Sequence, residues 1–122
     1  MPHDVRKSVW DALDACRKIQ EFTQGHTLET YQRNLRDRSA VERQFEILGE
    51  AFCRIDEADP SFRDEHLPEM GKIIGMRNRI IHGYDVVSDV VVWDAVTHNV
   101  PPLINKLTLW LGGESGNHSV LT

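Results

Sequence analysis

Apolar residues recur at intervals of three and four along almost the whole chain. No segment alternates apolar and polar residues for long between turn signals, so the pattern predicts helices throughout and no sheet. The first helix is expected to open after His3 with Asp4 as its N-cap and to stop near Gly25, a residue suited to the end of a helix. Thr27 can then cap a short second helix that includes Tyr31.

The third and fourth helices are predicted from longer apolar stripes. The sequence of Ser39–Glu42 has the form of a capping box, although the third helix can already begin near Asp37. The core stripe of this helix ends before Asp59-Pro60 and comprises Val41, Phe45, Leu48, Phe52 and Ile55. Residues 60–68 are expected to form a connector with one helical turn around Phe62. The fourth helix is predicted from about Glu69 to His82, with Gly83 placed to end it.

The last helix should begin near Ser88 or Asp85, either of which can cap it. Its apolar seam comprises Trp93, Val96, Val100, Leu103, Leu107 and Trp110. Pro101 and Pro102 fall inside this seam, so a kink or a break is expected there. The predicted fold class is all-α, a single-domain antiparallel bundle of about four to five helices over residues 1–111, followed by a disordered tail over residues 112–122.

Composition places the chain among folded globular proteins. Its 122 residues fit one domain, and 40% of them are hydrophobic and 27% charged. No apolar run approaches the roughly 18 to 20 residues that span a bilayer, and the N-terminus is too polar for a signal peptide. We therefore expect no membrane association and a cytoplasmic location. Cys16 and Cys53 are expected to be small buried hydrophobes, and the histidines lack the spacing of metal ligands, so no metal or other cofactor is predicted.

The formal net charge of −5 argues against a protein that coats nucleic acid through a broad basic surface, but it leaves room for a local site. Four arginines do cluster in one segment, at Arg33, Arg36, Arg38 and Arg43. Because acidic residues are interleaved with them, we expect this cluster to form a solvated charged face.

The fourth helix carries the sequence MRNRIIHGY at residues 76–84, which places charged side chains in an otherwise apolar segment. On a helical wheel of about 100° per residue, Arg77 falls inside an apolar arc made by Met70, Ile73, Ile74, Ile80 and Ile81. A buried guanidinium must be paired, so we expect Arg77 either to form an ion pair with Glu46 or Glu50 of the third helix or to belong to a functional site.

A second stripe on the same helix is small and polar and comprises Gly71, Gly75, Asn78 and His82. Two glycines inside a helix lower its propensity, and the close approach of another backbone would justify both. The symmetrical form of that approach is a homodimer in which the stripes of two subunits face each other.

Arg77, Asn78, His82 and Tyr84 lie within eight residues and offer a fixed cation, an amide, a group that titrates near neutrality and a phenol. This set suits phosphodiester chemistry without a metal, in which a neutral His82 accepts the proton of a ribose 2′-OH and Arg77 stabilises charge on the phosphoryl oxygens. Blander roles stay open, because His82 can be a helix-dipole partner and Tyr84 can pack its ring with the hydroxyl in water.

The spacing of Arg77 and His82 sets a geometric problem, because residues i and i+5 lie about 140° apart on an ideal helix. Three arrangements can close that gap: an arginine that bends around the helix, an unwinding at Gly83, or the same residues from a second subunit.

The arrangement Arg77-Asn78-x-x-x-His82-x-Tyr84 resembles the R-x4-H-x-Y signature of HEPN domains, and in particular of the HepT toxin family. The resemblance extends to DALDACRKIQEFTQG at residues 11–25, AVERQFEILGEA at 40–51, IIGMRNRIIHGYD at 73–85 and VVWDAV at 91–96. It covers roughly residues 4–111.

This resemblance implies a dimeric all-α bundle with metal-independent ribonuclease activity on RNA, in which Arg77 and His82 are catalytic and Asn78 is the supporting polar residue of the motif. It also implies a toxin-antitoxin pair, in which a cognate nucleotidyltransferase of the MntA type acts as antitoxin and attaches AMP to Tyr84. The alternative is a non-catalytic helical subunit that dimerises and binds nucleotide within a minimal nucleotidyltransferase complex. A third possibility is a helical interaction domain in which Arg77 is ion-paired and His82 caps a helix.

Overall fold

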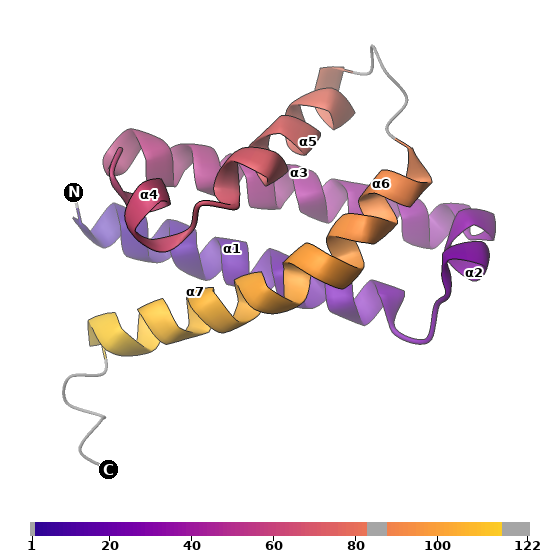
Figure 1. Cartoon of the computed structure of the whole chain (residues 1–122), viewed down its shortest axis with the longest axis horizontal. Helices are drawn as coiled ribbons and strands as arrows, with labels where there is room; N and C mark the ends of the chain where they lie inside the picture. Colours follow the sequence, from indigo (N-terminus) through magenta and orange to yellow (C-terminus); the bar gives the residue numbers. More distant parts are fainter. Residues whose placement is uncertain (1, 83–87, 116–122) are drawn as a thin grey trace.

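Two long antiparallel helices, α1 (Pro2–Thr23) and α3 (Leu35–Ala58), form the centre of the computed structural model, which describes residues 2–82 and 88–115 (Figure 1). On either side of this pair, α7 (Val100–Ser115) packs against α1 and α5 (Met70–His82) packs against α3. The short helices α2 (Leu28–Arg33) and α4 (Phe62–His66) lie near opposite ends of α3. All regular structure in the described residues is helical, so the predicted all-α class is confirmed.

The core lies where the apolar stripes of these helices meet. All five residues of the predicted α3 stripe, Val41, Phe45, Leu48, Phe52 and Ile55, are fully buried. Cys16 on α1 is also fully buried, and burial raises the pKa of its thiol to about 12, so it stays protonated as a small hydrophobe. Cys53 is only partly buried.

The turns around α2 confirm some predicted caps and correct another. Gly25 adopts a positive φ of 81°, and Thr27 caps α2 through a capping box with Thr30. The third helix begins at Leu35, because the side chain of Asn34 accepts a hydrogen bond from the backbone N–H of Asp37 at 2.9 Å. The capping box expected at Ser39–Glu42 was therefore wrong, since those residues already lie inside α3.

The last helical segment is divided where the prolines predicted a disturbance. Ser88 caps α6 (Asp89–Asp94), as predicted, and a π-helical segment, η1 (Ala95–Asn99), joins α6 to α7. Pro101 and Pro102 directly follow η1 in a continuous helical rod, so each removes an N–H that the helix would otherwise use. The hydrogen bonding shifts to the π pattern immediately before the two prolines, with the backbone N–H of Val100 bonded to the carbonyl of Ala95. Figure 1 shows the rod of α6, η1 and α7 bending at this place.

α7 continues to Ser115, beyond the predicted end of the bundle at residue 111. The predicted tail from residue 116 onward, and the possible cap Asp85, lie outside the described residues. None of the described helices is both long and apolar enough to cross a membrane.

α5 crosses α3 obliquely, and its C-terminal end rises away from the bundle (Figure 1). Its buried face comprises Met70, Ile73 and Met76, with Ile74 and Ile80 partly buried beside them. The predicted apolar arc was wrong at Ile81, which is 42% exposed, because the last turn of the helix passes beyond the side chains of the core. α5 therefore presents its last turn, which carries His82 of the predicted motif, at the surface.

Candidate active site

Arg77 lies where α5 meets α3, and its side chain is 22% exposed. Its aliphatic stem packs against Gly49, a buried residue in the middle of α3. A Cβ atom placed on Gly49 would lie only 2.4 Å from Cβ and 2.5 Å from Cγ of Arg77, far closer than such atoms approach in proteins. The two helices can therefore meet at this point only because residue 49 has no side chain.

The guanidinium of Arg77 has two neighbours that the structure identifies. Nη1 donates a hydrogen bond to Oδ1 of Asn78 at 2.7 Å, and Nη2 lies 3.8 Å from Oε2 of Glu50. The second distance is too long for a hydrogen bond, so Glu50 acts on Arg77 by charge alone. Of the two acids predicted as partners, Glu50 is the one found; Glu46 instead accepts a hydrogen bond from Arg43 at 2.9 Å.

Nε of Arg77 is buried and has no hydrogen-bond partner within the described part of the chain. The guanidinium of Arg77 is thus only partly buried, and its pairing with Asn78 and Glu50 leaves Nε without a partner in the described residues.

His82 is the last residue of α5 and its side chain is exposed. Because α5 remains an α-helix from Met70 through His82, the ideal separation of about 140° between Arg77 and His82 applies. Arg77 lies against α3, whereas His82 lies on the exposed last turn, so one chain does not bring the two onto a common face.

The predicted dimer stripe divides into two parts. Gly71 faces the guanidinium of Arg63 in the same chain, since an added Cβ would lie 3.1 Å from its Nη1 atom. Gly75, by contrast, is exposed, and a Cβ added there would meet no atom of the described residues within 4 Å. The described part of the chain thus gives Gly71 a neighbour at the tip of a flexible arginine and gives Gly75 none, and the dimer interface stays a prediction.

Tyr84 and Gly83 lie outside the described residues, so the predicted modification site and the predicted unwinding stay predictions as well.

The arginine cluster forms a largely solvated face with acidic neighbours, as predicted, since Arg33, Arg36 and Arg43 are exposed. Arg36 lies 3.4 Å from a carboxylate oxygen of Asp37, and Arg38 lies 3.2 Å from one of Asp89. Arg43 pairs with Glu46.

Arg79, on α5, is exposed and forms no ion pair with any described residue. It is therefore a natural control for the role of Arg77.

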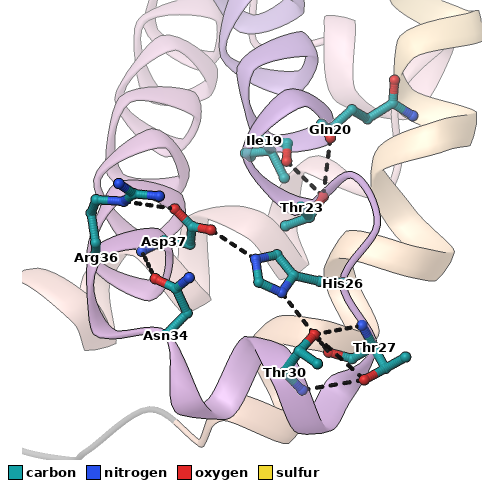
Figure 2. A network of polar contacts seen from close by, with 9 residues as sticks. All are labelled: Ile19, Gln20, Thr23, His26, Thr27, Thr30, Asn34, Arg36 and Asp37. Atoms are coloured by element: carbon teal, nitrogen blue, oxygen red, sulfur yellow. Dashed lines mark hydrogen bonds and ion pairs between the residues drawn. The ribbon is translucent and has the colours of Figure 1, made fainter.

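A second polar cluster surrounds His26, which sequence reasoning did not single out. Figure 2 shows the imidazole between two side chains, with Nε2 2.7 Å from Oδ2 of Asp37 and Nδ1 2.8 Å from Oγ1 of Thr30. This hydrogen bond from His26 lowers the pKa of the Asp37 carboxyl below its usual range. Oγ1 of Thr30 also accepts the backbone N–H of Thr27, so the hydroxyl serves the α2 cap.

The cluster thus joins the end of α1, the start of α2 and the start of α3, a structural role. In the part of the chain that the structure describes, no group of three His, Cys, Asp or Glu side chains is placed to hold a metal ion.

Sequence reasoning also missed Gly49. The available signal was a glycine inside a strongly periodic helix, in the segment AVERQFEILGEA, with no turn to require it. The partner that requires it lies on another helix, which the periodicity of α3 alone does not reveal.

Comparison with known proteins gives consistent matches. The sequence profile of the family described as "Ribonuclease HepT-like" matches residues 12–109. Two relatives from Methanocaldococcus jannaschii, both provisionally named RNases, are 29% and 31% identical over 104 and 108 residues. These alignments cover 85% and 87% of this chain and 84% and 95% of the relatives.

A protein of Thermococcus cleftensis, provisionally named ribonuclease HepT, is 33% identical over 98 residues, or 79% of this chain and 86% of that protein. No solved structure gives a significant match.

Proposed function

This chain belongs to the HepT-like ribonuclease family, and from this premise we propose that it is a metal-independent endoribonuclease with Arg77 and His82 as its catalytic residues. The observation that carries the assignment is the placement of Arg77. Its stem is held against α3, one nitrogen is held by Asn78, and its pairing with Glu50 at 3.8 Å leaves donors for a phosphoryl oxygen. An arginine fixed in this way is suited to stabilise charge that develops on a phosphate.

The proposed reaction is attack by the ribose 2′-oxygen on the adjacent phosphorus. Neutral His82 accepts the 2′-OH proton as the new O–P bond forms, and Arg77 stabilises the negative charge on the non-bridging oxygens. The P–O5′ bond then breaks, and the leaving 5′-oxygen takes up a proton from an imidazolium or from water. The products are a 2′,3′-cyclic phosphate and a free 5′-OH.

The proposed active form is a homodimer. Arg77 and His82 of one chain lie on different faces of a regular helix, so a site that uses both is completed by pairing two α5 helices. Gly75 is exposed, and no contact with the described residues accounts for a glycine there, which supports α5 as the contact helix. In this arrangement Arg77 of one subunit acts with His82 of the other.

We also propose that the protein is the toxin of a toxin-antitoxin pair. In this proposal a cognate nucleotidyltransferase binds the toxin and transfers AMP to Tyr84, which blocks RNA cleavage. The support is the match of Tyr84 to the motif tyrosine, two residues after His82.

The test of catalysis is cleavage of a defined RNA in EDTA by the wild type and by three variants. Arg77→Ala and His82→Ala are expected to lose cleavage while they remain folded dimers, and Arg79→Ala is expected to retain it. Arg79 is the matched control because it lies on the same helix, is exposed and has no ion pair with a described residue. The 5′ fragment should end in a cyclic phosphate, and a substrate with a single 2′-deoxy nucleotide at the cleaved bond should resist.

Equal cleavage by wild type, Arg77→Ala and His82→Ala would remove the site assignment. An equimolar mixture of the two variants tests the shared site separately. If the site uses Arg77 of one chain and His82 of the other, subunit exchange between the inactive variants restores part of the activity, because each heterodimer then contains one intact site and one doubly substituted site.

A further inference from the structure

Gly49 and Glu50 are consecutive residues of α3, and both meet the side chain of Arg77 from below α5. Gly49 meets its stem, where a Cβ would lie 2.4 to 3.2 Å from Cβ, Cγ and Cδ of the arginine. Glu50 meets its guanidinium, with Oε2 at 3.8 Å from Nη2. We refer to this pair of residues as the Arg77 seat.

The two residues of the seat restrict Arg77 in different ways. The stem occupies the space where a side chain of residue 49 would stand, so α3 limits the torsions that the first bonds of Arg77 can adopt. Asn78 holds Nη1 from within α5, and the charge of Glu50 attracts Nη2 from α3. Because the Glu50 contact is longer than a hydrogen bond, the carboxylate orients the guanidinium without occupying the donors of Nη2.

We propose that the Arg77 seat positions the guanidinium for contact with the scissile phosphate, with Glu50 as a positioning residue of the ribonuclease. This inference rests on the function proposed above. A flexible arginine must lose its conformational freedom before it meets the transition state, and the seat removes most of that freedom in the free protein. Glu50 acts only through Arg77 and does not exchange a proton with the substrate.

Glu46 provides the matched control, since it lies one helical turn before Glu50 on the same helix and pairs with Arg43 instead of Arg77. Replacing Glu50 by Gln removes the charge but keeps the size of the side chain and one acceptor oxygen. We expect Glu50→Gln to lower kcat roughly 10- to 100-fold with little change in KM, because misplacement of a group that acts in the transition state has this effect. Glu46→Gln should keep the wild-type kcat, and Glu50→Asp, which keeps the charge on a shorter arm, should fall between.

The decisive comparison uses an Arg77→Lys background with measurable residual cleavage in single-turnover assays. If Glu50 acts through Arg77, Glu50→Gln should lower the cleavage rate of the Arg77→Lys protein by a much smaller factor than it lowers the rate of the wild type. The position of the guanidinium is read independently by NMR from the Nε–H resonance of Arg77, which is assigned by its disappearance in Arg77→Lys. Glu50→Gln should shift this resonance and speed its exchange with water, while Glu46→Gln should leave it unchanged.

Wild-type kcat in Glu50→Gln would overturn the inference, as would an equal loss in both backgrounds, which would mean that Glu50 acts without Arg77. An unchanged Nε–H resonance in Glu50→Gln would overturn it too. Failure of the proposed function has a different signature: RNA cleavage that survives Arg77→Ala, or no cleavage by the wild type. In that case the resonance still reports whether the seat holds the guanidinium.

Discussion

Gly49→Ala is the substitution that tests most directly how α3 and α5 fit together. The added methyl group would lie 2.4 Å from Cβ of Arg77 and 2.5 Å from its Cγ. Cβ is fixed by the backbone of α5, so rotation of the Arg77 side chain cannot relieve the closest contact. Either α5 must move away from α3 or both helices must distort, and each response displaces Arg77.

The size of the effect follows from two opposing contributions. Alanine is favoured over glycine inside a helix by about 1 kcal/mol, whereas overpacking a filled interior costs about 1–3 kcal/mol. Gly75→Ala supplies the first contribution alone, because a Cβ at residue 75 meets no atom of residues 2–82 and 88–115 within 4 Å. The difference in unfolding free energy between the two variants should therefore equal the overpacking cost, with Gly49→Ala less stable than Gly75→Ala by about 1–3 kcal/mol.

Urea unfolding followed by far-UV circular dichroism measures this difference, provided that both variants are compared at several protein concentrations. The concentration series matters because Gly75 is also a predicted interface residue, and an alanine that weakens a dimer would lower stability more in dilute samples. RNA cleavage should fall in Gly49→Ala through displacement of Arg77. Equal stability of the two variants, with wild-type cleavage by Gly49→Ala, would refute the close fit of Arg77 on α3.

Two further predictions rest on the structure, and a third rests on the motif. The hydrogen bond from His26 lowers the pKa of Asp37 in the folded state, so this interaction should stabilise the fold above the ordinary aspartate pKa and be lost as the pH falls through the lowered value. Acid unfolding of Asp37→Asn should therefore depend less on pH than acid unfolding of the wild type. Identical acid transitions of the two proteins would contradict this role. Thr27→Ala should lower the unfolding free energy by about 1 kcal/mol, measured by urea titration, because the α2 capping box loses its threonine oxygen. Tyr84→Phe should cleave RNA like the wild type but gain no AMP mass on coexpression with the cognate nucleotidyltransferase, and added mass on this variant would place the modification elsewhere.

Much of the fold was predictable because it depends on the spacing of residues within a single helix. The stripe from Val41 to Ile55 follows the period of a single helix, and all of its members are buried. Thr27 and Ser88 were identified as caps because a cap is a contact between residues two or three apart. The start of α3 was missed because two capping signals compete there, and the side chain of Asn34 closes the helix before Ser39 is reached.

The candidate site shows the same difference between properties set within one helix and properties set by contacts between helices. The sequence by itself determined that Arg77, Asn78 and His82 share one helix and that Arg77 and His82 diverge, since these properties follow from helical spacing. It left open whether Arg77 pairs with an acid of the third helix or serves a site. Only the tertiary structure decided that Glu50 and not Glu46 is the partner, that Gly49 lies under the arginine, and that Ile81 is exposed. The physical reason is that contacts between helices depend on where and at what angle the two helices cross. If α5 crossed α3 one residue away from Gly49, Arg77 would meet a side chain in place of a glycine and could not pack there.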